Sequence, residues 1–448
     1  MIKSVLIANR GEIAIRIART ARRMGIKTYV VRTAKEPEAV YLSAADAVIN
    51  FPETDGNIPE FLDIDRLVGL AREYKIDSLH PGYGYLSENA ELAERCRDNG
   101  IVFIGPSPEV IRLMGDKVAA KGIAAQSGVP MLGASQGAVH TLDEARKIAK
   151  RLGYPVIIKA VSGGGGRGMR IVHHQDELEQ LYKIATAEAQ VAFNDPSVFI
   201  EKYLENPKHI EFQIVADNYG NVVHLGEREC SIQRKHQKLM EEAPSPALDE
   251  RLRKKMAAAA VSLAKQAGYQ SLGTVEFLLD HQKHFYFMEM NTRIQVEHGV
   301  TELVTGVDLV RQQLRIASGL ALRLRQEDVT LQGHAIECRI NAEDPSRNFA
   351  PCPGTLVSLH LPGGPGVRVD SAAYQGYKIP PFYDSMIGKL IVYGADREQA
   401  IVRMRRALAE MLFEGVVTAT DYQMHILCSK AFVEANFNVN SIANGDFD

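Results

Sequence analysis

An α/β fold with several lobes is predicted by three features of the sequence. Strand and helix patterns alternate over the first 115 residues, a glycine-rich loop joins two strand patterns in the middle of the chain, and the part after residue 333 combines short strands with one long helix. Alternation of this kind implies a parallel sheet with helices on its faces. The length of 448 residues corresponds to about three domains.

The first 115 residues carry the alternating units. Residues 12–24 repeat apolar side chains at helical spacing, and Gly25 ends this helix as a cap. Tyr83 and Gly84 follow a predicted strand, so they lie at the carboxyl edge of the sheet, where such sheets bind ligands. The strands expected here are 4–8, 27–32, 76–80 and 101–104, and a second helix is expected over 61–74.

The middle and the C-terminal part have their own patterns, without an internal repeat or a low-complexity linker. The middle is expected to contain strands at 155–160, 169–173 and 198–204, a helix at 250–267 and a hairpin formed by 274–279 and 285–290. The C-terminal part is expected to contain strands at 335–340, 356–361, 367–369 and 386–393, and a helix from 397 to about 413. These elements predict one compact body with several lobes.

Composition excludes several classes of protein. Lys and Arg total 52 against 55 Asp and Glu, and a formal charge of −3 lacks the basic excess of a nucleic-acid coat protein. No apolar run approaches the roughly 20 residues that span a bilayer, and the N-terminus lacks a secretory signal. The five cysteines are dispersed, which is typical of reduced, intracellular proteins without a thiolate metal site. We therefore expect a cytoplasmic protein that binds neither nucleic acid nor membrane.

The glycine run at 163–168 is a candidate phosphate-binding loop. Gly163, Gly165 and Gly168 satisfy G-x-G-x-x-G, but a strand pattern follows them where a dinucleotide fingerprint needs a helix. A loop between two strands can instead fold over phosphates as a lid, with its backbone amides as donors. Lys159 ends the preceding strand and can reach the same phosphates. The alternative is a flexible hairpin tip with a solvated lysine.

Two carboxylates face each other if the hairpin turn centres on residues 282 and 283. Glu276 and Glu289 are then directly opposite, and because like charges at that position repel, the pair needs a cation or a shared proton. Oxygen ligands beside a phosphate loop indicate Mg²⁺ or Mn²⁺. Asn291 falls on the same face as Glu289 and adds a carbonyl oxygen. The alternative is a register shifted by one residue, in which the carboxylates point apart.

Polar residues crowd the segment that follows. Arg293, Gln295, Glu297 and His298 lie within six positions; an arginine suits a planar oxyanion such as a carboxylate or bicarbonate, and a glutamate can act as a general base. The alternative is an ordinary polar loop.

Two other charged motifs have two interpretations each. The basic run 233–238 is either a solvated surface or a funnel for ATP phosphates or the reacting anion. Arg339 shares a strand face with Glu337 and either pairs with that glutamate or serves the site.

In combination, the segments resemble biotin carboxylase. The matching segments keep the family's order and cover nearly the whole chain: 7–14, 80–84, 114–117, 158–160, the glycine loop, 201–204, 289–298 and 337–344. The resemblance implies a Rossmann-like N-terminal domain at 1–115, an ATP-grasp domain at 116–332 with a mobile lid at about 131–203, and a mixed α+β C-terminal domain at 333–448.

The resemblance also implies an activity, the carboxylation of biotin on a separate carrier protein by ATP, bicarbonate and Mg or Mn. Glu297 deprotonates bicarbonate, which attacks the γ-phosphate of ATP; carboxyphosphate releases CO₂ and phosphate, the phosphate takes the ureido proton, and Arg339 stabilises the enolate. The implied partners are a biotin carboxyl carrier protein or domain, a carboxyltransferase subunit or domain and a second copy in a homodimer. Such a carboxylase is of the acyl-CoA type, as in acetyl-CoA carboxylase and fatty acid biosynthesis, or of the pyruvate type.

Roles pass from the family to the positions that match its motifs. The implied catalytic residues are Glu297, Arg339, Lys238 and Arg293. The implied ATP-binding residues are Lys117, Lys159, Gly164, Gly165, Gly166, Glu201, Lys202, Leu204, His209, Gln233, His236 and Leu278. Glu276, Glu289 and Asn291 are the implied metal ligands, Lys238, Arg293, Gln295 and Val296 the bicarbonate contacts, and Tyr83, Gly84 and Arg339 the biotin contacts.

The chain departs from the family pattern in a few places. Gly299 stands where the family usually has Pro or Thr, which predicts a looser loop behind Glu297, and residues 33–60 match poorly. No Ala-Met-Lys-Met occurs, so the biotinylated lysine is expected on another chain, and the end at Asp448 fits either a free-standing subunit or a domain of a longer polypeptide.

Two alternatives to this activity stay open. One is another ATP-grasp ligase of the amino-acid or carbamoyl-phosphate type, and the other is a non-catalytic scaffold; Arg293, Gln295, Glu297 and Arg339 favour biotin carboxylase. The sequence does not identify the final carboxyl acceptor.

Overall fold

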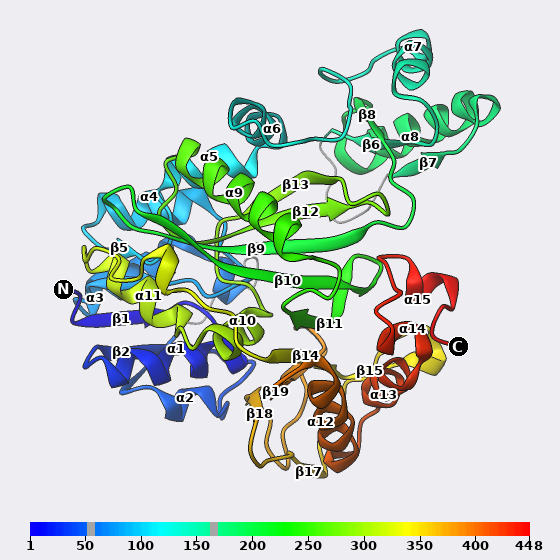
Figure 1. Cartoon of the computed structure of the whole chain (residues 1–448). Coiled ribbons are helices and arrows are strands. Elements are labelled where there is room, and N and C mark those ends of the chain that lie inside the picture. Colours follow the sequence, from blue (N-terminus) through cyan, green and yellow to red (C-terminus); the bar gives the residue numbers. More distant parts are fainter. Residues whose placement is uncertain (52–58, 162–168) are drawn as a thin grey trace.

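The computed structural model describes residues 1–51, 59–161 and 169–448 and confirms the α/β fold. A five-stranded parallel sheet occupies the N-terminal part, an eight-stranded antiparallel sheet runs from the middle into the C-terminal part, and a three-stranded sheet stands apart (Figure 1). The segments left out include Gly164, Gly165 and Gly166, so the predicted phosphate loop lies outside the described residues.

The N-terminal sheet has the strand order β3-β2-β1-β4-β5. Because side chains alternate across a strand, Val5 and Ile7 pack on one face and Leu6 on the other, in two separate cores. Its strands are β1 Ser4–Ile7, β2 Lys27–Arg32, β3 Ala47–Asn50, β4 Ser78–His80 and β5 Val102–Phe103, and its helices are α1 Gly11–Arg23, α2 Tyr41–Ala44, α3 Ile64–Glu73, α4 Ala90–Asp98 and α5 Pro108–Gly115. Strand order reverses beside β1, so the loops after β1 and β4 meet at the switch point where such sheets bind ligands.

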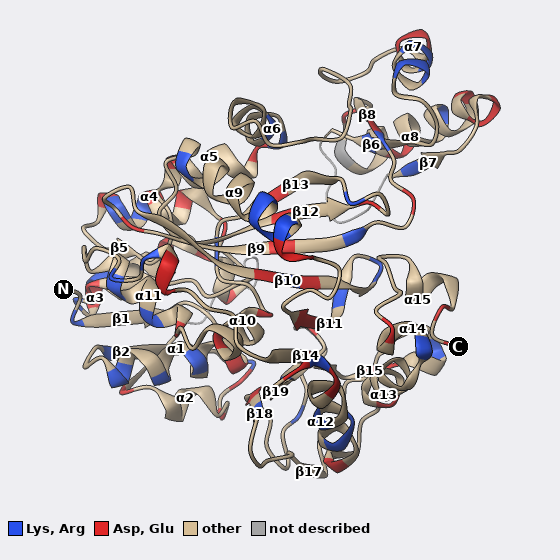
Figure 2. Ribbon diagram, viewed as in Figure 1, with Lys and Arg blue, Asp and Glu red and all other residues tan. Residues whose placement is uncertain are grey.

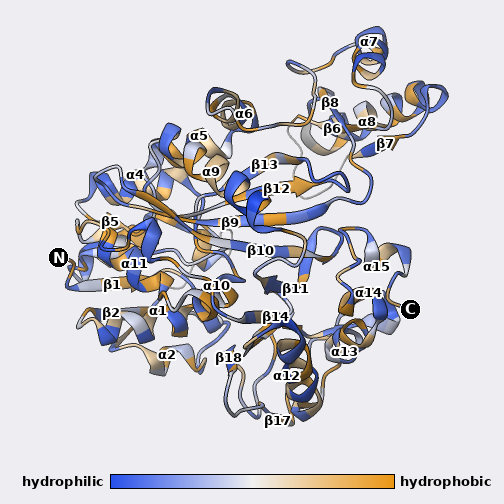
Figure 3. Ribbon diagram, in the orientation of Figure 1, coloured by the Kyte–Doolittle hydropathy of each residue, from blue (hydrophilic) through white to orange (hydrophobic). Residues whose placement is uncertain are grey.

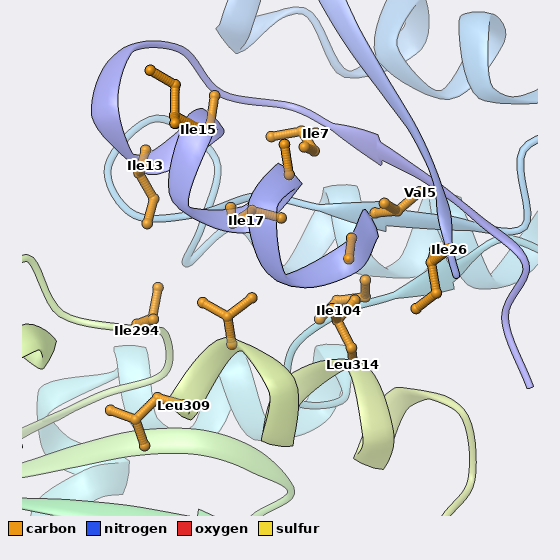
Figure 4. Close-up of a cluster of buried hydrophobic side chains, with 14 of the residues drawn as sticks. Val5, Ile7, Ile13, Ile15, Ile17, Ile26, Ile104, Ile294, Leu309 and Leu314 are labelled. Carbon is orange, nitrogen blue, oxygen red and sulfur yellow. The ribbon is translucent and has the colours of Figure 1, made fainter. Parts of the chain in front are cut away.

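One of these cores extends to the loop that follows the hairpin. Ile13 and Ile17 of α1 pack with Leu309 and Leu314 of α11 (Leu309–Ala317), and Ile294 belongs to the same cluster (Figure 4). Ile294 is fully buried, so it anchors a polar loop in an apolar core. The side chains on either side of it are thereby held in place.

The eight-stranded sheet is the scaffold of the molecule. Its order is β13-β12-β9-β10-β11-β14-β19-β18. The strands are β9 Lys208–Ala216, β10 Val222–Arg234, β11 Gln237–Ala243, β12 Ser271–Leu279, β13 Phe285–Asn291, β14 His334–Asn341, β18 Val367–Ser371 and β19 Met386–Gly394, and the helices of the middle part are α6 Lys117–Gln126, α9 Glu250–Gln266, α10 His298–Thr305 and α11. The middle and C-terminal parts therefore share one sheet across the β11–β14 pairing.

The hairpin of β12 and β13 has the predicted facing pair of carboxylates, but its register differs from the predicted one near the turn. Glu276 lies opposite Glu289, but Phe277 lies opposite Phe287, so a β-bulge separates the two pairs. Near the turn the register is one residue away from the predicted one, and the bulge restores it at the carboxylates.

The three-stranded sheet forms a separate layer with two helices, seen at the upper right of Figure 1. It consists of β6 Val156–Ala160, β7 Arg170–Val172 and β8 Val198–Lys202, with α7 Leu142–Leu152 and α8 Leu178–Phe193 packed against it. The expected strands at 155–160, 169–173 and 198–204 are confirmed here.

Two predicted helix ends are wrong. The helix predicted at 61–74 begins at Ile64, because the side chain of Asp63 caps it by accepting a hydrogen bond from the backbone N–H of Arg66. The helix predicted to end near 413 ends at Glu410, because residues 412–414 pair with another strand.

The remaining elements are α12 Arg397–Glu410, α13 Thr420–Cys428, α14 Lys430–Val433, α15 Ser441–Asn444, β15 Glu343–Asp344, β16 Ala350–Pro351, β17 Ser358–His360 and β20 Leu412–Glu414.

The helices are amphipathic and do not suit a bilayer. Helix α12 carries both hydrophobic and hydrophilic residues, and it buries Ile401, Met404 and Leu408 (Figure 3). Among the described residues, no helix combines the length and the apolar character needed to cross a membrane.

Two glycine substitutions, one in the turn after β4 and one in α3, test the account of this turn. Gly82 has φ +65°, and a Cβ there would lie 2.8 Å from Nδ2 of Asn9, which itself donates to the carbonyls of Pro81 and Tyr83. Gly82→Ala should therefore lower the free energy of unfolding by about 1–2 kcal/mol or more, measured by urea unfolding. Gly69→Ala, in the exposed middle of α3 with open space around it, should raise it by up to about 1 kcal/mol. Equal effects would contradict this account of the turn.

Candidate active site

Lys238 lies at the centre of a cluster of buried carboxylates. Its Nζ is 2.6 Å from Oε2 of Glu211, 3.2 Å from Oε1 of Glu276 and 2.6 Å from Oε1 of Glu297. Burial lowers the pKa of Lys238, but the three carboxylates outweigh burial and hold the pKa well above its usual value. One ammonium therefore joins β11, β9, β12 and the loop before α10.

Glu297 is fully buried and ionised. Burial raises the pKa of its carboxyl, but Lys238, Arg339 and Arg228 together hold the pKa well below its usual value. Oε2 of Glu297 is 2.9 Å from Nη2 of Arg339. A buried carboxylate between cations that can also bind an anion is suited to act as a base once that anion takes some of their hydrogen bonds.

Arg339 pairs with Glu297 and Glu241, so of its two interpretations the pairing with Glu337 is not the one observed. Nε of Arg339 donates to Oε1 of Glu241 at 2.7 Å, whereas neither oxygen of Glu337 accepts a hydrogen bond from any described residue. Burial raises the pKa of Glu241 to about 7, against the attraction of Arg339. The guanidinium therefore points toward Glu297 and Glu241 and not along its own strand.

The facing carboxylates of the hairpin differ in their partners. Glu276 is buried and contacts Nε2 of His209 at 2.9 Å, and it accepts a hydrogen bond from Nδ2 of Asn291 at 2.8 Å. Glu289 is exposed, and its side chain has no hydrogen bond or ion pair among the described residues. The surrounding protein and the charge of Glu276 raise the pKa of Glu289 to about 7. The predicted metal ligands thus lie together, with one carboxylate free to bind a cation.

The loop after β13 orders its polar side chains around Arg293. The guanidinium of Arg293 donates to Oε1 of Gln295 at 2.9 Å, to Oδ1 of Asn291 at 3.1 Å and to Oε2 of Glu88 at 2.9 Å. Nε2 of Gln295 is buried without a hydrogen-bond partner among the described residues. A buried amide donor beside a guanidinium fork offers two donors to a small planar anion.

The other predicted ATP residues fall into two groups. Near the hairpin, Nε2 of Gln233 lies 3.4 Å from Nδ1 of His209, and Leu278 pairs with His209 across the strands. In the small sheet, Nζ of Lys159 is 2.6 Å from Oε2 of Glu201, and Lys121 pairs with the same carboxylate. Among the described residues, no side-chain hydrogen bond or ion pair joins the two groups.

Three further predicted residues flank these groups. Nζ of Lys202 donates to the carbonyls of Gly153 and Tyr154, so this side chain serves the small sheet itself. Leu204 follows β8, and Lys117 begins α6 on the surface.

The basic run at 233–238 divides between surface and site. Lys235 and His236 are exposed in the turn between β10 and β11 and have positive φ angles, 49° and 65°. Arg234 lies over the ring of Phe349. Lys238 is the member that reaches the buried cluster, so the run is only partly a solvated surface, and its role as an anion funnel stays a prediction.

Tyr83 and Gly84 lie at the switch point, as predicted. The hydroxyl of Tyr83 donates to the carboxylate of Glu12 on α1. Burial and the charge of Glu12 raise the pKa of Tyr83, so the phenol keeps its proton. Arg339 is close enough to oppose this shift, which places Tyr83 beside the charged cluster.

Sequence reasoning missed Glu211, Arg228, Glu88 and Lys389. Arg228 is fully buried and pairs with Glu211 from the neighbouring strand, and it also donates to Oγ1 of Thr301 on α10 at 2.9 Å. Glu211 and Arg228 are charged residues inside strands that are otherwise almost wholly buried, and this was a usable signal. Acidic residues lie on β9, β10 and β12 (Figure 2), and Glu211, Glu229 and Glu276 among them are buried.

The space that a side chain at position 299 would occupy is filled by Ile391 and Glu337. A Cβ at Gly299 would lie 2.3 Å from Cδ1 of Ile391 and 3.3 Å from Oε2 of Glu337. Ile391 is fully buried and packs where the family's larger residue is expected, so the structure shows close packing behind Glu297 and not the predicted loosening.

Family models match three successive parts of the chain. They describe the biotin carboxylase N-terminal domain, at residues 1–111, the carbamoyl-phosphate synthase L chain ATP binding domain, at 116–325, and the biotin carboxylase C-terminal domain, at 337–444. A biotin carboxylase of Nostoc sp. is 54% identical over 438 residues, which are 98% of each chain. The chain belongs to the biotin carboxylase family.

Other biotin carboxylase relatives belong to different carboxylases. A pyruvate carboxylase subunit of Methanothermobacter thermautotrophicus is 51% identical over 96% of this chain and 88% of its own. A solved structure of the biotin carboxylase domain dimer of Hydrogenobacter thermophilus 2-oxoglutarate carboxylase, with MgADP, ADP and bicarbonate, is 47% identical. It has a TM-score of 0.94 and covers 100% of this chain and 99% of that chain.

Removing the central ammonium tests the cluster. Lys238→Met leaves three buried carboxylates without their shared cation, so the free energy of unfolding should fall by about 3–5 kcal/mol in urea unfolding. Lys254→Met is the matched control, because Lys254 is exposed on α9 and pairs with Glu250 at 3.3 Å; its effect should stay within about 0.5 kcal/mol. Similar losses in both variants would contradict the arrangement.

Proposed function

We propose that this biotin carboxylase uses ATP and bicarbonate to carboxylate biotin on a separate carrier protein, through carboxyphosphate. The observation that carries the proposal is the placement of Glu297 between two cations, Lys238 and Arg339. These cations lie between a pair of facing carboxylates on one side and Tyr83 at the switch point on the other. This arrangement suits a reaction that deprotonates one anion and stabilises a second.

The proposed cation site fits the residues present. Glu276 and Glu289 face each other. Desolvation and then the charge of Glu276 raise the pKa of Glu289, so a divalent cation would relieve a repulsion that the fold itself creates. Glu276 and Glu289 would hold Mg²⁺, with the side-chain oxygen of Asn291 nearby. When bound, the ion neutralises charge on the phosphates of ATP.

ATP binding is proposed to involve both groups of residues. One group belongs to the larger sheet and its β10–β11 turn: His209, Gln233, His236 and Leu278. The other belongs to or adjoins the part proposed as a lid, with Lys159, Gly164, Gly165, Gly166, Glu201 and Lys202 inside it, Leu204 at its end and Lys117 before it. Because Lys159 is paired with Glu201, phosphate oxygens would compete with that carboxylate for the ammonium.

Bicarbonate is proposed to bind at the loop after β13. The proposed donors to the anion are the guanidinium of Arg293, which already contacts Oε1 of Gln295, the unpartnered Nε2 of Gln295, the backbone at Val296 and the ammonium of Lys238. A bound anion draws hydrogen bonds of Lys238 away from Glu297, which raises the pKa of Glu297 and makes it a better base. The deprotonated anion then attacks the γ-phosphate: its oxygen forms a bond to phosphorus, the bond between that phosphorus and the β,γ-bridging oxygen breaks, and ADP leaves.

Biotin is proposed to bind where Tyr83, Gly84 and Arg339 converge. The ureido proton would leave with the phosphate that carboxyphosphate releases, and the guanidinium of Arg339 would stabilise the negative charge on the ureido oxygen. Exclusion of water by the lid would protect carboxyphosphate from hydrolysis.

The proposed partners follow from the reaction. A carrier domain must deliver biotin and a carboxyltransferase must consume the carboxylated product, and a homodimer is also proposed, because the 2-oxoglutarate carboxylase relative is described as a domain dimer. Pyruvate and 2-oxoglutarate carboxylases both occur among the relatives, so the acceptor is left to the carboxyltransferase. We propose boundaries at 115/116 and 332/333, close to the ends of the matched family models.

Substrate dependence of ATP hydrolysis tests the proposal directly. Release of phosphate from ATP should require bicarbonate, which accepts the phosphoryl group of ATP, and should rise when free biotin is added, because biotin consumes the CO₂ that carboxyphosphate then releases. ATP turnover that is indifferent to both substrates would contradict the proposal and favour another ATP-grasp ligase.

Glu297→Gln separates binding from proton transfer. The amide keeps the size of the side chain but does not accept the bicarbonate proton, so bicarbonate-dependent turnover should fall by about 10²–10⁴-fold. The affinity for ATP, measured by calorimetry, should stay close to that of the unmodified protein. Near-normal turnover in this variant would show that Glu297 is not the base.

A further inference from the structure

A single buried lysine contacts residues from all three parts of the chain. Lys389 lies on β19, and its side chain is fully buried. Its Nζ donates to the carbonyl oxygen of Val296 at 2.7 Å and lies 3.1 Å from Oε1 of Glu12 on α1. Neither the reaction steps described above nor the sequence motifs use this lysine.

The contact with Glu12 extends to Tyr83, which together with Gly84 and Arg339 forms the proposed biotin wall. Glu12 is buried. Its Oε1 accepts a hydrogen bond from the hydroxyl of Tyr83 and also forms the ion pair with Lys389. The ammonium of Lys389 also lies 6.0 Å from the centroid of the Tyr83 ring. The position of Tyr83 is thus fixed through Glu12 by the same ammonium.

The contact with Val296 lies within residues 293–296, the proposed bicarbonate loop. Val296 stands between Gln295, whose amide nitrogen is unpartnered among the described residues, and Glu297, the proposed base. A charged donor on the carbonyl of Val296 holds the backbone between these two side chains. A displacement there would move the proposed anion donor and the base together.

Lys389 keeps its charge despite complete burial. Burial lowers the pKa of this lysine, but the carboxylates of Glu12, Glu337 and Asp370 outweigh burial and raise the pKa above its usual value. A buried ammonium is costly to maintain unless its partners are well placed. Its geometry is therefore tightly constrained, as a spacer between two binding surfaces requires.

We propose that Lys389 is a positioning residue that sets the spacing between the bicarbonate loop and the biotin wall through Val296 on one side and Glu12 with Tyr83 on the other. The proposal rests on the function proposed above. It predicts that biotin and bicarbonate are linked through this lysine, whereas ATP, whose proposed contacts lie elsewhere, is not.

Lys389→Met tests the spacing by removing the donor while keeping the length of the side chain. With free biotin and bicarbonate as substrates, KM for each should rise about tenfold, because a small misplacement of reacting groups has an effect of at least this size. KM for ATP should not change. Tyr83→Phe should raise KM for biotin in the unmodified protein and add nothing in the Lys389→Met background.

Two further variants guard against loss of folding. Glu12→Gln combined with Lys389→Met leaves no unpaired buried charge between these two positions and should show the same division of KM values. Lys208→Met is the control, because Nζ of Lys208 donates to the carbonyls of Ala435 and Phe437 away from the site; it should lower thermal stability without changing any KM.

The outcomes separate the two proposals. Unmodified protein whose ATP hydrolysis ignores bicarbonate and biotin would overturn the proposed function. If the unmodified protein depends on both substrates while Lys389→Met, alone or with Glu12→Gln, keeps normal KM values, the positioning role alone is overturned. An equal rise in all three KM values would also overturn it, because a general structural defect predicts that result.

Discussion

Three buried carboxylates converge on the ammonium of Lys238, and the architecture of the site depends on that interaction. The carboxylates come from β9, β12 and the loop before α10, whereas Lys238 lies on β11. Strand order places β9 and β10 between β12 and β11, so the lysine reaches across the face of the sheet. Buried charges are stable only when they are paired, and the pairing therefore ties the sheet to the catalytic loop.

The same charges prepare the site for anionic substrates. Arg228 forms an ion pair with Glu211, and Arg339, on β14 in the C-terminal part, forms an ion pair with Glu297. Carboxylates already occupy these cations, so a substrate anion must displace part of an existing pairing. In the proposed function, that exchange gives binding of bicarbonate a direct effect on the basicity of Glu297. A net charge of −3 for the whole chain conceals these strong local fields.

Much of this could be predicted from local sequence patterns, and the misses have a common physical origin. The opposition of Glu276 and Glu289 follows from counting along one hairpin, although the bulge that restores it does not. Glu211, Glu88 and Lys389 were missed because each acts on residues distant in the sequence, and strand order or domain packing decides such contacts. The close packing at Gly299 was missed for the same reason, since Ile391 comes from another strand. The end of α12 was missed because the pairing of β20 with β17 overrides helical propensity.

Transfer of oxygen from bicarbonate to phosphate tests the central claim most directly. If Glu297 activates bicarbonate for attack on the γ-phosphate, the bond between that oxygen and phosphorus survives when carboxyphosphate releases CO₂. With ¹⁸O-labelled bicarbonate in unlabelled water, each phosphate released should therefore carry one labelled oxygen, detected by mass spectrometry. Phosphate that takes its new oxygen from water would contradict the account.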